Sequence, residues 1–419
     1  MLNNNGLTKL KEVLKDKTYC YSISILLLGL IPILPFRGKG VLVAIFIITA
    51  ILSLQNKTRK LNYLYLINTV LFIGYLISLL YTDTIKQGLS ILETTLSLLI
   101  FPLGFMLFSG NNKIIKSILK QEKKCKYVFI GASFFLAILI FYTSLEFGNY
   151  GTEKINLNNF LKTLNQNFYW LTDHPIYLSI FLAVSLLMIA SLYKNSNKKS
   201  KFLLALIGLF QIFVLILMSR KGILFSVFLS IFLFFILYIK LNKKHIIQVI
   251  IVSIFFSLIT FKYAPDTLKR FRETFDSKSY KKIENYSSTS IRYGIYKCAF
   301  HKISNSWLIG YGVGDVKNEL LECYQKTSPV LVKGQYNSHN QYLKILLSIG
   351  FIGLMLFLVS LFINLKLFYI KKDYFAFCLL IMYMGFMLTE NILDRQNGVI
   401  LFSFLLNYYC FKNTNLDLK

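Results

Sequence analysis

Acidic residues are scarce in this sequence. Asp and Glu number only 19 among 419 residues, against 47 Lys and Arg, and the formal net charge is +28. The loops predicted to lie outside the membrane contain no DxD-type pair of carboxylates that could bind a divalent metal. We therefore expect chemistry without a metal or another cofactor. In a soluble chain this charge would favour a nucleic-acid partner, but the placement of the Lys and Arg residues argues against one.

Cysteine and histidine are also few. The six cysteines show no CxxC spacing, which argues against the usual zinc and redox motifs. Cys298 and Cys323 fall in one predicted loop, where an oxidising compartment would permit a disulfide. The chain has four histidines, and one of them, His339, stands directly before a membrane-length apolar run in "YNSHNQYLKILLSIG" (336–350).

Long hydrophobic runs, by contrast, occur from one end of the chain to the other. Hydrophobic residues make up 55% of the sequence, and the mean hydropathy is +0.56. The first run is followed by Arg37 and Lys39 rather than by a small-residue cleavage site, so we expect a retained helix and not a signal peptide. Runs of about 20 residues predict an all-α polytopic membrane protein, because a backbone in lipid must pair its own polar groups. We place about twelve spans, at 20–36, 40–54, 61–81, 89–108, 127–147, 176–193, 201–218, 221–241, 246–262, 342–370, 374–389 and 397–411.

The distribution of Lys and Arg predicts the orientation of these spans. With the amino terminus in the cytoplasm, the inner segments hold 25 Lys and Arg, whereas the short outer loops hold eight. Both termini are then cytoplasmic, and the excess charge is mainly a topology signal that suits anionic inner-leaflet lipids. The predicted divisions are 1–262, with nine spans and an outer loop at 148–175; 263–341, a large outer loop between the ninth and tenth spans; and 342–419, with the last three spans and a cytoplasmic tail.

The large outer loop is basic, although the positive-inside rule does not require it. It carries thirteen Lys and Arg counted from Lys262, which suits an anionic partner. Within it, "SSTS" (287–290) offers N-cap hydroxyls to a short amphipathic helix that we predict at 291–303. The glycines of "WLIGYGVGD" (307–315) indicate a tight turn or a close backbone approach. They follow a helix rather than a strand, which argues against a dinucleotide-binding loop.

Several unusual polar residues fall on the same outer face. Arginine suits pyrophosphate because its planar fork matches phosphate oxygens, and histidine exchanges a proton near neutral pH. Ordinary interpretations stay open: the basic residues can contact lipid phosphate or water, the histidines can begin helices, and the acidic turn can be solvated or hold a structural ion pair. The residues are His174, Arg220, Arg292, His339, Glu390, Asp394 and Arg395.

Three motifs stand out in the carboxy-terminal half. "SRKG" (219–222) precedes a span, "IRYGIYKCAFHKISNSWLIGYGVGD" covers 291–315, and "HNQYLKILLSIGFIGLMLFL" covers 339–358. In these motifs, in their order and in the long outer loop between them, the chain resembles the O-antigen ligase/polymerase family of bacterial membrane glycosyltransferases. "DHPIYL" (173–178) and "TENILDRQNG" (389–398) add weaker support.

This resemblance implies a GT-C-like enzyme of the bacterial inner membrane with its active site facing the periplasm. It would move a glycan from undecaprenyl pyrophosphate to an acceptor, which for a ligase is the lipid A–core oligosaccharide, with inversion. By motif, His339 would orient or deprotonate the acceptor hydroxyl, while Arg220 and Arg292 would hold the pyrophosphate and stabilise its developing charge. Membrane lipids are the other expected partners, and nucleic acid is not one. Further substrate contacts are expected from Lys221, His174, Tyr177, Asn340, Tyr342 and Arg395.

The sequence departs from the family in one place and leaves other functions open. Lys221 stands where a small residue is common, which adds charge beside Arg220. Polymerases of the same group tend to carry an Arg-x10-Gly pattern, but Ile231 and Ile303 occupy the corresponding positions here, which favours a ligase. Transfer of a glycan to protein is a third possibility within the group.

Two further alternatives come from other classes. A transporter would need ionisable residues near the bilayer midplane and broken helices in matching halves. Glu93 is the main deep acidic residue in the predicted spans, and the other polar groups gather at one face. This distribution favours an enzyme over a transporter or a purely structural membrane protein.

Overall fold

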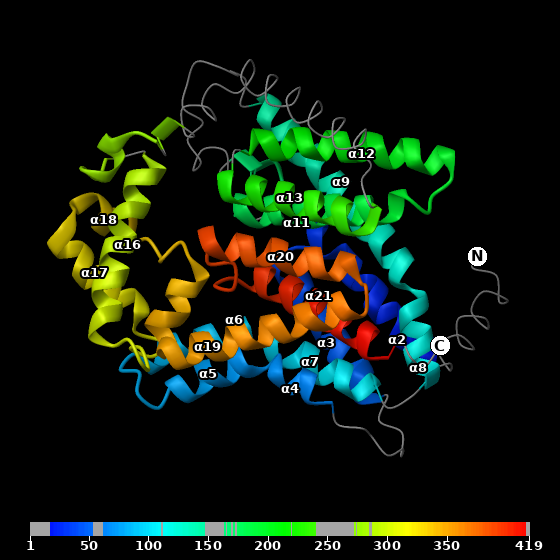
Figure 1. Cartoon of the computed structure of the whole chain (residues 1–419), viewed down its shortest axis with the longest axis horizontal. Helices are drawn as coiled ribbons and strands as arrows, with labels where there is room; N and C mark the ends of the chain where they lie inside the picture. Colours follow the sequence, from blue (N-terminus) through cyan, green and yellow to red (C-terminus); the bar gives the residue numbers. More distant parts are fainter. Residues whose placement is uncertain are drawn as a thin grey trace.

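The computed structural model describes most of the chain as a bundle of helices (Figure 1). Every regular element in the described part of the chain is helical. The described residues are 17–52, 62–109, 112–146, 163–164, 166–168, 171, 174–218, 220–239, 272–273, 275–284 and 287–415.

The helices follow one another with short connections where these are described. Those before residue 150 are α2 (Lys17–Leu27), η1 (Leu28–Ile33), α3 (Phe36–Leu52), α4 (Tyr63–Ile67), α5 (Val70–Ser78), α6 (Ile85–Thr95), α7 (Ser97–Phe108), α8 (Asn112–Lys120) and α9 (Glu122–Glu146). Those after it are α11 (Pro175–Tyr193), α12 (Lys198–Leu217), α13 (Lys221–Phe234), η2 (Phe235–Ile239), η3 (Ser277–Tyr280), α16 (Ser288–Asn305), α17 (Val316–Thr327), α18 (Pro329–Gly334), α19 (Gln341–Ile370), α20 (Tyr374–Thr389) and α21 (Gln396–Thr414).

The predicted spans coincide largely with these helices. Eleven of the twelve fall on helices or on consecutive pairs of them, and the remaining one, 246–262, lies outside the described residues. The chain is a polytopic membrane protein, and the count of twelve spans stays a prediction. Six helical segments among the described residues are long and apolar enough to cross a membrane: Ile85–Phe108, Asn112–Leu145, Pro175–Tyr193, Lys198–Leu217, Lys221–Tyr238 and Gln341–Ile370.

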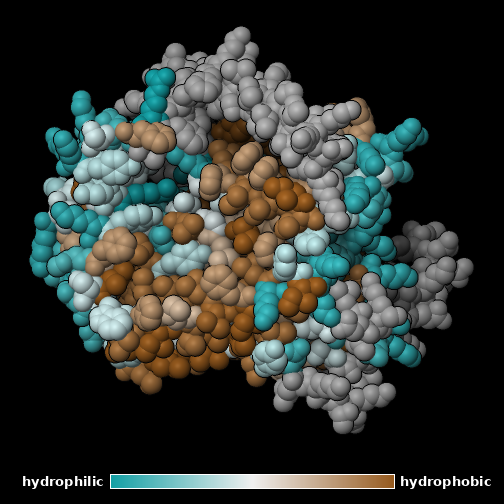
Figure 2. All heavy atoms as spheres, in the orientation of Figure 1, coloured by the Kyte–Doolittle hydropathy of each residue, from teal (hydrophilic) through white to brown (hydrophobic). Residues whose placement is uncertain are grey.

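Helices α11 and α21 form the centre of the bundle. Both are apolar around most of their circumference, and nearly all of their side chains are buried. Helix α19 instead exposes a stripe that includes Phe351, Met355, Val359 and Phe362. Figure 2 shows apolar side chains gathered across the middle of the molecule, with hydrophilic ones towards both ends. This is the distribution expected of helices that cross a bilayer and end in water.

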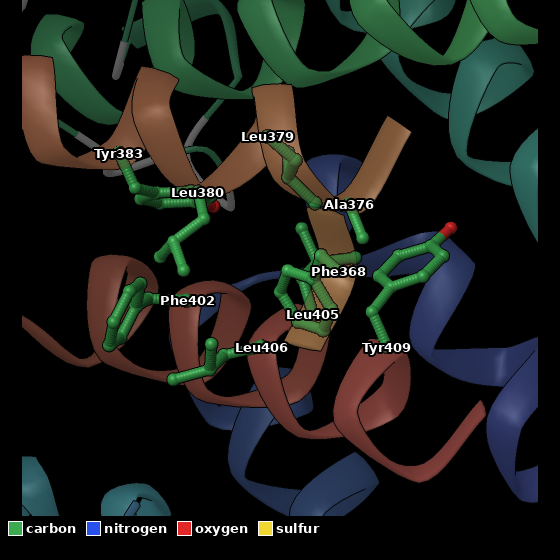
Figure 3. A pocket seen from close by; sticks show the side chains of 9 residues that line it. All are labelled: Phe368, Ala376, Leu379, Leu380, Tyr383, Phe402, Leu405, Leu406 and Tyr409. Atoms are coloured by element: carbon green, nitrogen blue, oxygen red, sulfur yellow. The ribbon is translucent and has the colours of Figure 1, made fainter. Parts of the chain in front are cut away.

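The contact between α20 and α21 is closely packed. Figure 3 shows Leu379 and Tyr383 of α20 facing Phe402 and Leu405 of α21. The cavity between them has a volume of only about 10 Å³, roughly what one water needs, and its lining is almost wholly apolar. It is a packing gap and not a ligand site.

The predicted long span 342–370 is not one continuous helix. Its backbone leaves helical geometry at Ile349 and Gly350, and the φ of Gly350 is +63°. A Cβ on Gly350 would collide with the backbone of Leu308, so only glycine fits this break. A run of this length predicts a helix that tilts or overshoots the bilayer. The structure instead divides it into a short segment next to the cap and a longer one.

The glycine-rich segment 307–315 makes the close backbone approach that its sequence indicates. The backbone N–H groups of Tyr311 and Gly312 donate to the carbonyls of Leu347 and Ser348 at 2.8 and 2.9 Å. Gly310 and Gly312 have φ of +73° and +91°, in the left-handed region. The segment therefore supplies hydrogen-bond partners to the broken helix α19, which lipid cannot do.

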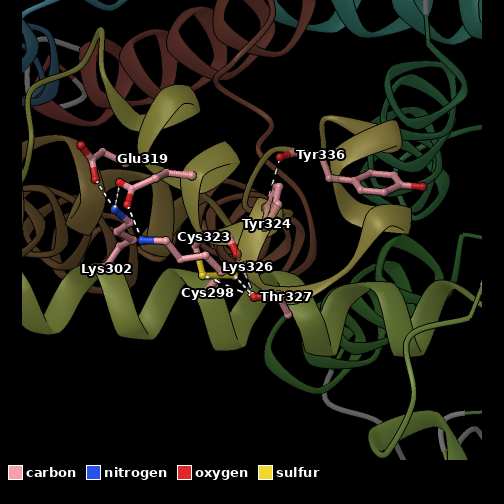
Figure 4. Close-up of a disulfide and its surroundings, with 9 residues drawn as sticks. Cys298, Lys302, Glu319, Cys323, Tyr324, Lys326, Thr327 and Tyr336 are labelled. Carbon is pink, nitrogen blue, oxygen red and sulfur yellow. Dashed lines mark hydrogen bonds and ion pairs between the residues drawn. A yellow bond between two sulfur atoms is a disulfide. The ribbon is translucent and has the colours of Figure 1, made fainter.

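Helices α16, α17 and α18 form a cap at one end of the bundle, at the left of Figure 1. The predicted amphipathic helix at 291–303 is confirmed as part of α16, and the Ser287 hydroxyl accepts a hydrogen bond from the Ser290 N–H at 3.3 Å. A disulfide between Cys298 and Cys323, which the sequence only permitted, joins α16 to α17 (Figure 4). Beside it, Lys302 pairs with Glu319 at 2.7 Å and with Glu322 at 2.6 Å. The cap is thus braced as a unit next to the ends of the membrane helices.

Candidate active site

The end of the bundle beside the cap gathers residues that are far apart in the sequence. Helix ends place most of them: His174, Arg220 and Arg395 are the N-cap residues of α11, α13 and α21, and Glu390 is the C-cap of α20. The N-termini of these three helices and of α19 add partial positive charge at this end. The gathered residues are His174, Arg220, Arg292, His339, Glu390 and Arg395.

Glu390 is the residue on which these contacts meet. One carboxylate oxygen, Oε1, accepts a hydrogen bond from an Arg292 guanidinium nitrogen at 2.6 Å. The other, Oε2, lies 3.0 Å from Nδ1 of His339. The Glu390 side chain is only 10% exposed, whereas those of His339 and Arg292 are 25% and 32% exposed. The carboxylate therefore lies beneath a histidine and an arginine that a substrate can reach.

Burial and charge act in opposite directions on the ionisation of Glu390. Burial raises its pKa, but the hydrogen bond and charge of His339 and the charges of Arg292 and Arg220 lower it, and the resulting pKa lies below the ordinary value. Glu390 is therefore ionised at neutral pH. An ionised carboxylate accepts a hydrogen bond, so Nδ1 of His339 is the nitrogen that donates to it, and Nε2 is the ring nitrogen that remains for a substrate.

The backbone around His339 is held by several contacts. His339 has a φ of +44°, which is uncommon for a residue other than glycine. Its N–H donates to the side-chain oxygen of Asn337 at 3.1 Å, and the Tyr296 hydroxyl of α16 donates to its carbonyl at 3.3 Å. Such a conformation persists where its surroundings hold it, and it directs the ring towards Glu390.

His174 differs from His339 in its environment. Burial and the charges of Arg220 and Arg395 together lower its pKa to about 4, although the charge of Glu390 acts in the opposite direction. Its Nδ1 accepts the Ile176 N–H at 3.4 Å as the cap of α11. His174 is therefore neutral at physiological pH. The helix-start interpretation of this residue is correct, and it nevertheless lies close enough to the other site residues for their charges to act on it.

Gly222 sets the spacing between α13 and α20 at the site. A Cβ at this position would collide with the side chain of Thr389, the residue before Glu390. The first turn of α13, which Arg220 precedes, can therefore lie directly against the last turn of α20. Close approach of membrane helices through small residues is common. In this way the glycine of "SRKG" brings Arg220 to the face that holds Glu390.

Two residues predicted to contact substrate, Asn340 and Tyr342, instead make contacts within the protein that support the site. Asn340 caps α19 by accepting the N–H groups of Tyr342 and Leu343 at 2.9 and 3.1 Å, and its amide donates to the Leu388 carbonyl at 3.1 Å. The Tyr342 hydroxyl donates to the Met384 carbonyl at 3.0 Å. Both residues tie α19 to α20 and so fix the distance between His339 and Glu390.

Three further residues predicted to contact substrate, Tyr177, Arg395 and Lys221, lie in different settings. Tyr177 is 5% exposed, and its hydroxyl donates to the Asn391 carbonyl at 3.4 Å, which ties α11 to the turn after Glu390. Arg395 is exposed at the start of α21, and Lys221 is the first residue of α13. Of these three, Arg395 is the one whose charge reaches His174.

Asp394 belongs to a network beside the site and not to its centre. Its carboxylate accepts the Asn391 amide at 3.0 Å and lies 4.0 Å from the ammonium of Lys344. Asn391 also bonds to the hydroxyl of Ser338, next to His339. The structural ion-pair interpretation therefore fits Asp394, whereas the solvated-turn interpretation is wrong for Glu390, which is buried.

The described residues hold no group of three or more His, Cys, Asp and Glu side chains arranged to bind a metal ion. The Glu390 carboxylate already contacts the side chains of Arg292, which is positively charged, and His339, which can become so. The arrangement offers guanidinium groups, a histidine nitrogen and helix N-termini. Such groups bind a polyanion and exchange a proton.

Comparison with known families agrees with this arrangement. Residues 202–358 match the family model described as O-antigen ligase, Wzy_C. This stretch of the chain is similar to the O-antigen ligase family. The match includes Arg220, Arg292 and His339 and confirms the resemblance drawn from the three motifs. No curated protein matches the chain at a significant level.

Glu390 is the functional candidate that sequence reasoning undervalued. It lies outside the matched residues 202–358, in a motif that gave only weak support. The sequence does contain one indication of its importance: Glu390 is a carboxylate at the end of an apolar helix, on a face rich in Lys and Arg. Its pairing with Arg292 and His339 depends on contacts across 98 and 51 residues of sequence, which no local pattern reports.

Proposed function

We propose that this protein is an O-antigen ligase-like glycosyltransferase of the bacterial inner membrane. It moves a glycan from undecaprenyl pyrophosphate to a hydroxyl of a lipid A–core acceptor at the periplasmic face. The observation that carries the proposal is the bridge from Arg292 through Glu390 to His339, beside Arg220, at the membrane-helix ends. The family match supports the reaction class.

The proposed role of His339 is that of general base. Glu390 fixes the ring so that Nε2 accepts the proton of the acceptor hydroxyl while its oxygen attacks the anomeric carbon. The new glycosidic C–O bond forms as the bond from the anomeric carbon to the pyrophosphate oxygen breaks, with inversion. The proton stays on His339, whose positive charge Glu390 stabilises. A positioned base of this kind contributes on the order of 10²–10⁴ in rate.

The proposed role of the arginines is to bind the donor and its leaving group. Undecaprenyl pyrophosphate gains negative charge as the glycosidic oxygen departs. Arg220, Arg292 and Arg395 lie where guanidinium donors can meet phosphate oxygens, and the helix N-termini add to the positive potential. Interactions that strengthen as this charge develops lower the barrier. We accordingly expect the transfer to need no divalent metal.

The proposed orientation places the cap in the periplasm and both termini in the cytoplasm. The disulfide of the cap supports it, because such bonds persist in oxidising compartments. The excess of Lys and Arg in the predicted inner segments supports it independently.

Genetic complementation tests this function. Cells that lack the gene would receive the wild-type protein, His339→Ala, or the control His301→Ala, which alters an exposed histidine of α16. We expect wild type and the control to restore long-chain polysaccharide on lipid A–core, and His339→Ala to leave the polymer on its lipid carrier.

Two other results would point elsewhere. Lipid A–core carrying a single repeat unit in the deletion strain would assign the protein as a polymerase. An unchanged polysaccharide ladder after deletion would refute both assignments.

A further inference from the structure

A second polar site lies at the opposite end of the bundle from the candidate active site. A pocket of about 560 Å³ opens between the first turn of α9, the carboxy-terminal ends of α11, α19 and α21, and the amino-terminal end of α20. Helices α11, α19, α20 and α21 each have their other end at the candidate active site. Helix α11 alone, with 19 residues, spans about 28 Å at 1.5 Å per residue, close to the thickness of a bilayer core.

The charge of this pocket is strongly positive. Its lining includes two carboxylates, Glu122 and Asp373, against six lysines. Both carboxylates already have lysine partners, because Lys412 lies 3.0 Å from each of them and Lys126 lies 3.0 Å from Glu122. The lining therefore has an excess of four positive charges. The six lysines are Lys120, Lys123, Lys126, Lys371, Lys372 and Lys412.

The inner wall of the pocket is braced and partly aromatic. The Lys126 ammonium lies 4.0 Å from the centre of the Phe375 ring and donates to the Ser191 hydroxyl at 3.3 Å. Phe234 and Tyr238 also line the pocket, on the side of α13 and η2. A cationic rim beside aromatic and aliphatic side chains at the end of membrane helices matches the two parts of a phospholipid, an anionic headgroup and apolar chains.

We propose that this pocket binds a phosphate ester, supplied by an anionic phospholipid of the leaflet opposite the active site. The phosphate lies among the lysines of the rim, and the acyl chains follow the apolar surface between the helices. A soluble phosphate ester would satisfy the lysines but would make no contact with the apolar part of the lining. The proposal does not depend on the proposed enzymatic function, because its residues lie at the far ends of the helices.

Lipid binding to the purified full-length protein tests the proposal. Native mass spectrometry and thermal unfolding would be followed in detergent with added phosphatidylglycerol, phosphatidylcholine or glycerol phosphate. We expect phosphatidylglycerol alone to be retained and to raise the unfolding temperature. The double variant Lys123→Gln/Lys372→Gln should bind it on the order of tenfold more weakly, since each lysine near a membrane surface contributes to attraction of anionic lipid.

The matched control removes two lysine charges at a different place on the same end of the bundle. Lys198→Gln/Lys199→Gln alters two exposed lysines at the start of α12 that do not line the pocket, and it should bind phosphatidylglycerol nearly as wild type does. Equal binding of glycerol phosphate would retain the phosphate site but assign it to a soluble ester. Equally weak binding of phosphatidylglycerol to both double variants would overturn the proposal, because the attraction would then reflect general surface charge. Equal retention of phosphatidylcholine would also overturn it, because the binding would then reflect general affinity for lipid.

Discussion

At the scale of single residues, Glu390 connects the features of the candidate site. Its carboxylate contacts the side chains of both Arg292 and His339, and its ionisation determines which nitrogen of His339 accepts a proton. His174 and Asp394 lie nearby but are held differently: His174 is neutral, and the carboxylate of Asp394 pairs with Asn391 and Lys344 rather than with the His339 ring. These differences allow each residue to be tested by itself.

Replacing Glu390 with Gln should lower the rate of glycan transfer on the order of 10²-fold or more, because His339 loses the charge that orients it as a base. The rate would be measured with purified protein and a lipid-linked donor. The matched control is Asp394→Asn, which removes a nearby carboxylate that has no contact with His339. Wild-type transfer by Glu390→Gln would contradict the proposed role of this carboxylate.

His174 should make the protein less stable as the pH falls. Its pKa is about 4 in the folded protein and 6.5 ordinarily, so between these values the unfolded chain binds a proton that the folded chain excludes. The free energy of unfolding therefore decreases as the pH falls from 6.5 towards 4. Thermal unfolding of His174→Gln should show a smaller decrease over this range than wild type. The exposed-histidine variant His301→Gln should follow wild type, and a wild-type slope in His174→Gln would disprove the assignment.

At the scale of elements, close helix contacts and one broken helix determine the geometry of the site. Gly222 allows α13 to approach α20 beside Glu390, and Asn340 and Tyr342 tie α19 to α20. The break at Gly350 separates the short segment of α19 that follows His339 from its longer part. Residues 307–312 fill that break with backbone hydrogen bonds and so join the cap to the bundle.

Gly222→Ala should reduce transfer by roughly tenfold or more, because a methyl group would press on Thr389 and shift Arg220 relative to Glu390. It should also destabilise the protein by about 1–3 kcal/mol, the usual cost of overpacking. Activity and thermal unfolding would both be measured. Gly131→Ala in α9 is the control, since nothing lies within 4 Å of the added Cβ. Equal activity in the two variants would show that the approach of α13 to α20 is not required.

At the scale of the whole molecule, two polar ends are separated by an apolar belt. The cap and the candidate active site occupy one end, and the lysine-rich pocket occupies the other. Helices α11 and α19, which are long and apolar enough to cross a membrane, reach from one end to the other, so the proposed orientation puts the two sites on opposite sides of the bilayer. The distribution of charge and the disulfide of the cap both favour a periplasmic active site.

Cysteine labelling should reveal this orientation. Lys297→Cys places a thiol on the exposed side of α16, and Lys199→Cys places one at the start of α12. A membrane-impermeant maleimide added to spheroplasts should label the first variant and label the second only after lysis. The parent protein, whose Cys20 is partly exposed, supplies the background. The reverse pattern would invert the proposed topology.

The sequence by itself determined the membrane class, the helical architecture, the family resemblance and most of the residues proposed for the candidate site. Hydrophobic runs of bilayer length and short motifs are local properties, and they survive without knowledge of the fold. Only the tertiary structure decided that α19 is broken at Gly350, that Glu390 joins Arg292 to His339, and that six lysines surround one pocket. These features depend on helix ends that are distant in the sequence and meet through side-chain packing and backbone pairing across helices. The apolar composition requires the helices to pack, but it does not specify which of their ends come together.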